Sequence, residues 1–312
     1  MKFFLKIILL CLALILLLSG CADVPTAKEG YRFTDDLGET VTVAETPKRV
    51  AVLFSSYAEM WTLSGGEIAI TVGESVERGF ADESTPLVDA GAGKSISVET
   101  LIGEAPDFVI ASADIPAQVE AASLLRKMGI PAACFRVESF ADYERVMAVF
   151  TDITGDKEAY EAEVLAVRTG IEEILNAAEG RSSRILFIRC GSGYSATKAK
   201  GTKDHFVAGM LAELGCENIA DSATVLLDGL SIETILAEDP DYIFFSTMGD
   251  EEKAKQYMES VMLQPLWQSL DAVKNNRYVF LPKSLFHYKP NARWDEAYAF
   301  LKERVYGNEN GS

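Results

Sequence analysis

Two stretches of the sequence, ISVETLIGEAPDFVIAS (residues 96–112) and LSIETILAEDPDYIFFS (residues 230–246), follow one pattern and decide the fold. Aligned without gaps, they are identical at Ser97/Ser231, Glu99/Glu233, Thr100/Thr234, Glu104/Glu238, Pro106/Pro240, Asp107/Asp241 and Ser112/Ser246. Each copy reads as a Ser-capped helix, a Pro-Asp turn and a buried strand. A chain that carries this unit twice is predicted to have two similar lobes, with a ligand cleft between them.

Further short apolar runs predict the other strands of the two lobes. These runs are RVAVLF (49–54), IPAACF (130–135), RILFIRC (184–190) and RYVFL (277–281), and YRFTDDLGETVTV (31–43) predicts two short strands around an Asp-Leu-Gly turn. Ser55 and Ser56 are expected to cap a helix that runs to Gly65. Because helical patterns separate many of the strands, the fold class is α/β, with parallel sheets built from βαβ units.

One segment interrupts this alternation. Between residues 156 and 179 apolar side chains recur at spacings of three and four, as in one amphipathic helix: Tyr160, Val164, Val167, Ile171, Ile174 and Ala178. Asp156 is a suitable N-cap and Gly180 a suitable stop. We interpret the helix as the connection between an N-terminal lobe (31–154) and a C-terminal lobe (181–312), with 155–180 as the connecting helix. A helix packed within one domain is the alternative.

The first twenty residues are typical of an export signal. Lys2 and Lys6 precede an apolar run over residues 7–18, which is too short to span a bilayer comfortably. The following Leu18-Ser19-Gly20-Cys21 resembles the lipobox of bacterial lipoproteins, in which the Cys becomes the acylated N-terminus. We therefore expect a signal peptide (1–20), a tether (21–30) and a protein anchored outside the cytoplasm by lipidated Cys21. A plain secretory signal with a chance Cys is the alternative.

The amino-acid composition favours a globular protein and argues against nucleic-acid binding. Of 312 residues, 48% are apolar and 24% charged, which is a globular balance. Asp and Glu number 47 against 29 Lys and Arg, for a net charge of −18. Nucleic-acid binding rests on neutralising phosphates with Lys and Arg, so no nucleic-acid partner is expected.

Cysteine and histidine usage gives no metal cluster. Apart from Cys11 in the signal and Cys21 in the lipobox, the cysteines are Cys134, Cys190 and Cys216, without CxxC spacing, and His205 and His287 lie far apart. A pairing of Cys190 with Cys216 stays open, but three buried thiols are the preferred interpretation. We expect no metal to be held directly by these side chains.

Two short motifs partly match the signatures of nucleotide-binding sites. AGAGKS (90–95) lacks the first glycine of a phosphate-binding loop, because Val88 stands in its place. Gly191, Gly193 and Ala196 fit a dinucleotide fingerprint, but a polar, glycine-interrupted stretch follows instead of a helix. With no nucleophile elbow or carboxylate pair at hand either, we predict that the protein is not an enzyme.

The sequence resembles the solute-binding lipoproteins of ABC importers for ferric siderophores, haem and cobalamin. The lipobox, the 31–43 opening, both copies of the repeated element, GCENIA (215–220) and LWQSLDAVKNNRYVFL (266–281) carry this resemblance. It implies two α/β lobes joined by one long helix, a shallow ligand cleft between them, and a permease as partner. It also implies that Glu99 and Glu233, one per lobe, dock into Arg pockets of the permease; simple helix capping is the alternative role.

Ligands of open α/β lobes meet the loops that follow the carboxyl ends of strands. Those loops and their neighbours offer these ligand-binding candidates: Ser55, Ser56, Tyr57, Lys94, Arg136, Tyr194, Lys198, Lys200, Met248, His287, Tyr288 and Arg293. Each has a solvated loop residue as its alternative. Lys and Arg gathered there would favour an anionic chelate.

The expected ligand is a metal chelate, most of all a ferric siderophore, with cobamide and then haem as alternatives. No intrinsic cofactor is expected, and the protein is expected to be a monomer. An extracytoplasmic enzyme on the same fold and a lipoprotein that only scaffolds or adheres are the alternatives of other classes.

Overall fold

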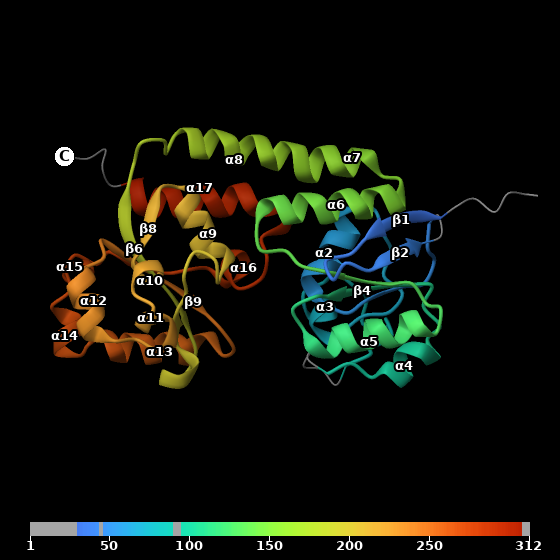
Figure 1. Cartoon of the computed structure of the whole chain (residues 1–312), viewed down its shortest axis with the longest axis horizontal. Helices are drawn as coiled ribbons and strands as arrows, with labels where there is room; N and C mark the ends of the chain where they lie inside the picture. The colour runs from blue at the N-terminus through green and yellow to red at the C-terminus, as the bar shows by residue number, and fades with distance from the viewer. Residues whose placement is uncertain (1–29, 44–45, 90–94, 308–312) are drawn as a thin grey trace, which may run out of the picture.

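The computed structural model describes residues 30–43, 46–89 and 95–307, which form two α/β lobes under a long helix (Figure 1). In the N-terminal lobe, strands β3 (Val50–Val52), β4 (Phe108–Ser112) and β5 (Ala132–Phe135) make a parallel sheet in that order. An antiparallel hairpin of β1 (Tyr31–Thr34) and β2 (Thr40–Val43) precedes it. The helices of this lobe are α2 (Ser55–Leu63), α3 (Gly73–Glu77), α4 (Val98–Gly103), α5 (Pro116–Lys127) and α6 (Phe140–Thr154). The predicted strands and the α/β class are confirmed here.

The C-terminal lobe is built around the long strand β6 (Ser183–Cys190). Strands β9 (Tyr242–Thr247) and β10 (Tyr278–Phe280) continue the sheet on one side of β6 in parallel. On its other side lie the parallel β8 (Cys216–Asn218) and the antiparallel β7 (Lys198–Ala199), two strands too short to be predicted. The helices are α9 (Phe206–Glu213), α10 (Ile219–Ser222), α11 (Val225–Asp228), α12 (Ile232–Glu238), α13 (Glu251–Met262), α14 (Pro265–Gln268), α15 (Asp271–Lys274), α16 (Lys283–Phe286) and α17 (Trp294–Tyr306).

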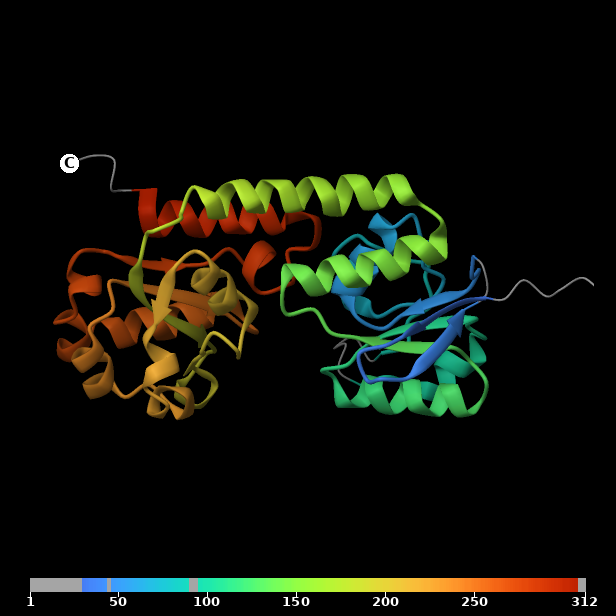
Figure 2. The ribbon, with the colours of Figure 1, turned by 45° about the horizontal axis from the view of Figure 1, so that its top comes forward.

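The helix between the sheets runs without a break through α7 (Lys157–Tyr160), one π-helical turn (Glu161–Leu165) and α8 (Ala166–Asn176). The carboxylate of Asp156 caps it by accepting the N–H of Ala159 at 2.9 Å. It ends three residues before the predicted end, and the chain turns through Gly180 at a φ of +77°. Figure 2 shows α17 beside α8, so a second helix also lies under the first.

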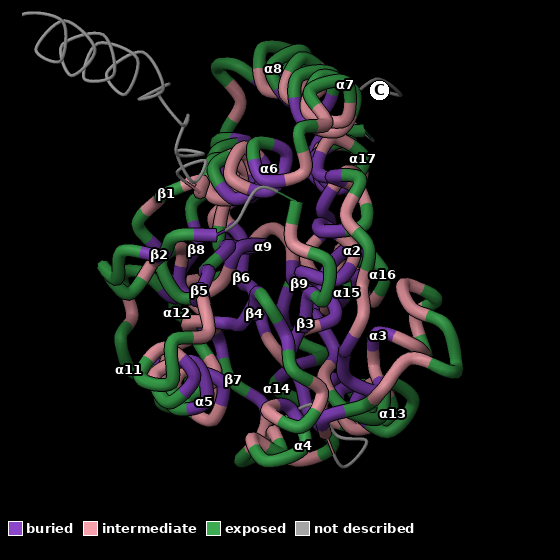
Figure 3. The backbone as a smooth tube through the Cα atoms, turned by 90° about the vertical axis from the view of Figure 1, so that its right-hand side faces the viewer, coloured by how far each residue is buried: buried purple, intermediate pink, exposed green. Residues whose placement is uncertain are grey.

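Strand side chains alternate between the two faces of each sheet. Val50 and Val52 of β3 point into one core and Ala51 into another, as do Phe187 and Leu186 of β6. The buried strands occupy the middle of the molecule in Figure 3. The core on the face toward α8 is continuous through both lobes, whereas the opposite face of each sheet has a core of its own.

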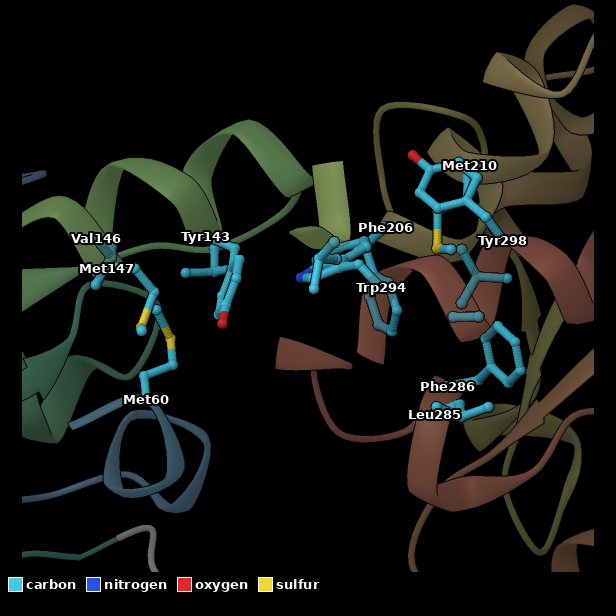
Figure 4. Close-up of a cluster of buried hydrophobic side chains, with 14 of the residues drawn as sticks. Met60, Tyr143, Val146, Met147, Phe206, Met210, Leu285, Phe286, Trp294 and Tyr298 are labelled. Carbon is cyan, nitrogen blue, oxygen red and sulfur yellow. The ribbon is translucent and has the colours of Figure 1, made fainter. Parts of the chain in front are cut away.

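The shared core joins residues from both sides of the cleft (Figure 4). Met60 and Tyr143 come from the N-terminal lobe, and Phe206, Trp294 and Tyr298 from the C-terminal lobe. The rings of Phe140 and Trp294 meet edge to face at 6.4 Å across the lobe boundary. A single apolar cluster therefore holds the two lobes together beneath the helix.

The sequence repeat is a structural repeat. Ser97 caps α4 and Ser231 caps α12, each by accepting an N–H three residues on, and a strand follows each helix. In both lobes an Arg at the start of a sheet strand donates to the carboxylate of the Glu at the helix end. Arg49, directly before β3, donates to Glu104 at 3.2 Å, and Arg184, the second residue of β6, donates to Glu238 at 2.5 Å.

The aspartate of each repeat makes a second matching contact. The Asp107 carboxylate accepts the N–H of Arg49 at 2.9 Å, and the Asp241 carboxylate accepts the N–H of Arg184 at 2.8 Å. The identical Glu and Asp of the two copies therefore do the same work in each lobe: they join the helix end and the turn to the neighbouring strand.

Cys134, Cys190 and Cys216 are free and buried, as preferred from the sequence. Cys216 lies opposite Ser183 at the start of β6, and Cys190 stands seven residues further along that strand. That separation is about 23 Å at 3.3 Å per residue, too far for a disulfide. Burial raises the pKa of Cys190 to about 12 and that of Cys134 and Cys216 to about 11, so these thiols are unreactive at neutral pH.

The buried side chain of His205 is expected to make the stability of the protein depend on pH. Its Nδ1 accepts the N–H of Val207 at 3.3 Å and so caps α9, with the ring packed between Phe187 and Phe206. Burial, then the charges of Lys289 and Arg189, hold the pKa of His205 well below its usual range. Its stabilising contribution is therefore complete above the unfolded pKa of about 6.5 and falls below it, by up to about 1.4 kcal/mol per pH unit.

His205→Asn keeps a capping oxygen and removes the titration. Denaturant unfolding between pH 7 and pH 5 is expected to show a smaller loss of unfolding free energy in this variant than in the parent. His287→Asn measures separately the share of the other histidine, whose pKa burial also lowers. Parallel pH curves for parent and His205→Asn would contradict the assignment.

Candidate functional site in the cleft between the lobes

A cleft of about 630 Å³ lies where the two lobes face each other. The N-terminal lobe contributes Phe54, Ser56 and Glu74, and the C-terminal lobe contributes Arg189, Gly191, Ser192, Ala196, Met248, Gly249, Asp250, Lys283, His287, Tyr288 and Lys289. Most of these residues follow the carboxyl ends of β3, β6, β9 and β10, which is where parallel α/β sheets present their binding loops.

Four of the residues proposed from the sequence lie together in this wall: Ser56, Met248, His287 and Tyr288. Met248 directly follows β9, and the other lobe supplies Ser56 from the first turn of α2. The Ser56 hydroxyl is buried and has no hydrogen-bond partner among the described residues. It is therefore a polar group that a ligand can satisfy.

The structure places the other candidates elsewhere. Tyr57 belongs to the core, where its hydroxyl donates to the Phe135 carbonyl at 2.6 Å. Arg136 is paired with Asp114 at 2.6 Å and Arg293 with Glu296 at 2.7 Å, both at exposed positions outside the cleft. Neither Tyr194 nor Lys198, both exposed, nor Lys200 lines the cleft. Lys94 lies outside the described residues.

Ser55 differs from its expected role as a helix cap. It lies inside the first turn of α2, is fully buried, and its hydroxyl donates to the carboxylate of Glu74. The N-cap position is Phe54, which makes no side-chain cap. Ser55 thus acts behind the cleft wall, by holding Glu74, which does line the cleft.

The cleft contains three cations that the sequence did not single out. Lys289 is paired with Glu138 at 2.8 Å and lies over the Phe206 ring at 4.6 Å, and burial lowers its pKa. Arg189 and Lys283 form no ion pair with any described residue. Of the two acids, Asp250 is already paired with Lys253 at 2.9 Å, and Glu74 accepts from Ser55. The Ser55 hydroxyl does not neutralise Glu74, so two cations without an ion pair, Arg189 and Lys283, face one carboxylate without an ion pair. The balance of unpaired charge in the cleft is therefore positive.

The position of Arg189 in the sequence could have identified it as a ligand-binding candidate. It is a charged residue near the carboxyl end of the otherwise apolar run RILFIRC, at the edge of the sheet where ligands bind. Lys283 carried a similar signal, because it stands two residues after the strand run that ends at Leu281. Glu74 carried none, because it stands in a short helix distant in sequence from the other cleft residues.

His287 is set up as a neutral acceptor. Its Nδ1 lies 2.9 Å from the Thr247 carbonyl, which accepts only if Nδ1 carries the proton, so Nε2 has a free lone pair. Burial lowers the pKa of His287, which keeps the ring neutral at neutral pH. A backbone-anchored imidazole of this kind can accept a hydrogen bond or bind the metal of a ligand.

Two further observations on the described residues concern metal ions and membranes. In the part of the chain that the structure describes, no group of three or more His, Cys, Asp or Glu side chains could hold a metal ion. Across residues 30–43, 46–89 and 95–307, no helix is long and apolar enough to cross a membrane.

Solved structures share this two-lobe architecture at low sequence identity. The siderophore-binding protein BauB, bound to ferric iron and two acinetobactin molecules, is 17% identical with a TM-score of 0.70, over 88% of this chain and 98% of its own. IsdE of S. aureus, complexed with haem, is 16% identical with a TM-score of 0.67, over 83% and 98%. An ABC transporter substrate-binding protein of Listeria monocytogenes EGD-e is 17% identical with a TM-score of 0.67, over 83% and 99%.

No curated protein sequence matches the chain. The family model described as "Periplasmic binding protein" matches residues 50–285, a segment that includes the first strand of the N-terminal sheet, the long helix and most of the cleft residues. With both lobes, the helix between them and the cleft accounted for by that match, the chain belongs to the periplasmic binding protein family.

Proposed function

We propose that this protein captures a ferric siderophore outside the cytoplasm and delivers it to the permease of an ABC importer. The observation that carries the proposal is the pair of cations without an ion pair, Arg189 and Lys283, which outnumber the one lining carboxylate without an ion pair, Glu74. The other lining acid, Asp250, is paired with Lys253. Ferric catecholate and carboxylate siderophores are anionic, oxygen-rich chelates that bring their own metal ligands. Arg offers such a chelate bidentate hydrogen bonds, and the rings of Phe54 and Tyr288 offer it flat apolar surface.

Haem is the second candidate, because one cleft wall carries three side chains able to bind its iron. His287 has a free Nε2, and Met248 and Tyr288 stand beside it in the lining. The same cations would then pair with the haem propionates. In either case the ligand is bound and released unchanged, so no turnover is expected.

The ligand proposal predicts the effect of neutralising the cleft cations. Arg189→Gln with Lys283→Gln is expected to weaken binding of a ferric tris-catecholate probe by roughly tenfold or more per charge lost, because each removes a charged hydrogen bond worth about 1.5–3 kcal/mol. Tryptophan fluorescence titration measures this, and raising the salt is expected to weaken the parent further.

Lys198→Gln with Lys200→Gln is the matched control, since it removes the same charge outside the cleft. Equal dissociation constants for the two double variants would rule out Arg189 and Lys283. If haemin binds the parent and the catecholate, a trihydroxamate chelate and cobalamin do not, haem replaces the siderophore as the ligand.

We also propose that Glu99 and Glu233 dock the two lobes onto the permease. Both are exposed, both lie in the first turn of equivalent helices, and the repeat presents them in the same way in each lobe. Charge-assisted pairing with one Arg per permease subunit would let the importer sense the relative position of the lobes.

Alanine at both glutamates is therefore expected to abolish uptake in cells and the stimulation of the transporter's ATPase, with ligand affinity unchanged. Glu172→Ala with Glu173→Ala, two exposed glutamates of α8, controls for the loss of charge. Normal transport by the Glu99/Glu233 double variant would show that these residues are merely good first-turn residues.

Anchoring through Cys21 is proposed from the sequence, and this residue lies outside the described part of the chain. Cys21→Ala is expected to shift the protein from the membrane fraction to a soluble or unprocessed pool, because no thiol remains there to carry the acyl chain. Incorporation of labelled fatty acid is the measurement, and Cys134→Ala is the control that keeps it. Undiminished labelling of Cys21→Ala would overturn the anchoring site.

A further inference from the structure

Four residues of the C-terminal lobe, 288–291, reach across to the N-terminal lobe, and we refer to them as the crossing segment. The Tyr288 ring lies 4.0 Å from the guanidinium of Arg78, and the Lys289 ammonium lies 2.8 Å from the Glu138 carboxylate. The Asn291 amide donates to the Ser56 carbonyl at 3.1 Å and to the Glu59 carboxylate at 2.8 Å. Three of the four residues thus contact the other lobe.

Asn291 is the most constrained member of the crossing segment. It is fully buried and has a φ of +53°, a left-handed conformation that Asn tolerates better than most residues. Its amide reaches both the backbone and a carboxylate of α2. Because this buried amide has two partners in the other lobe, the lobes can separate at Asn291 only if both hydrogen bonds break together.

Arg78, at the end of α3, joins this contact to the cleft wall. It donates to the Glu59 carboxylate and to the Ser55 hydroxyl, each at 3.0 Å, while its face covers Tyr288. Ser55 in turn donates to Glu74. Arg78 is not in the lining, yet it holds two residues that are: Tyr288 by stacking and Glu74 through Ser55.

Glu59 depends on partners from both lobes. Its carboxylate is largely buried between Arg78 of its own lobe and Asn291 of the other. Burial raises the pKa of Glu59, while the hydrogen bonds from Asn291 and Arg78 act in the opposite direction. The charge of Arg293 acts in the same direction as these hydrogen bonds. Separation of the lobes would therefore remove two of the three groups that offset the cost of burying this charge, Asn291 and Arg293.

We propose that Arg78, Glu59 and Asn291 are positioning residues that fix the lobes at their binding distance and hold Tyr288 and Glu74 in the cleft wall before a ligand arrives. If the cleft wall is already ordered in the ligand-free protein, binding requires no lobe closure. Less of the binding free energy is then lost to ordering side chains, so the affinity is higher. The lobe-spacing part stands on the contacts alone, whereas the effect on affinity rests on the proposed function.

The test compares three variants with the parent. Asn291→Ala removes both hydrogen bonds across the boundary, and Arg78→Lys keeps the charge but loses the planar face over Tyr288 and one of the two donated bonds. Arg49→Lys is the matched control: it makes the same chemical change at an Arg that pairs with Glu104, outside the cleft.

Hydrogen exchange in the ligand-free protein is the first measurement. Peptides covering residues 283–293 are expected to exchange at least roughly tenfold faster in Asn291→Ala than in the parent, while peptides of β6 are unchanged. Small-angle scattering is expected to give a larger radius of gyration for the same variant. The Arg49→Lys control is expected to match the parent in both.

Binding of the ferric tris-catecholate probe, or of haemin if only haemin binds the parent, is the second measurement. Asn291→Ala and Arg78→Lys are each expected to weaken it by roughly three- to tenfold, with Arg49→Lys unchanged. Unchanged exchange and scattering in Asn291→Ala would overturn the lobe-spacing role. Unchanged affinity in both cleft variants would overturn the positioning role.

The two proposals fail in different ways. A parent protein that binds none of the chelates refutes the proposed function, but its exchange and scattering still decide the role of the crossing segment. If Asn291→Ala does not fold, Arg78→Lys, which keeps a cation beside Glu59, carries the same comparison.

Discussion

The apolar core beneath the long helix is the constraint on which the rest of the structure depends, because both lobes share it. Tyr143 of α6 and Trp294 of α17 are fully buried, and they come from opposite sides of the cleft. Large aromatic side chains dominate the free energy of such clusters, and a core packs at high density without voids. Movement of one lobe against the other would have to open this core. The packing of the core therefore fixes the distance between the lobes across the cleft.

Polar contacts refine what the core establishes. The crossing segment ends three residues before Trp294, so residues 288–294 together supply cleft lining, hydrogen bonds across the boundary and the start of the helix that packs against α8. His287 and Tyr288 lie within four residues of Asn291, whose amide donates to the Ser56 carbonyl of the other lobe. The binding wall and the connection between lobes are one structural unit.

The electrostatics of the cleft oppose those of the whole molecule. A net charge of −18 gives the protein a field that repels anions at long range. Arg189 and Lys283 reverse the sign locally, with no described carboxylate paired to either. For an anionic chelate, recognition would come from contacts inside the cleft, where screening is weak, and not from steering at a distance.

The sequence alone determined the fold, because fold signals are local. Period-two and helical spacing, Ser97 and Ser231 as caps, and the repeated Pro-Asp turn each act within a few residues, so the main strands, the long helix and the two-lobe duplication were predicted correctly. The short strands β7 and β8 were not predicted. Only the tertiary structure decided the site. Tyr57 and Tyr288 are the same residue type after a strand, yet one packs into the core and the other lines the cleft. Glu74 and Arg189 meet from positions 115 residues apart in sequence, and which side chains face each other there depends on how the shared core sets one lobe against the other, a long-range packing that no local pattern encodes.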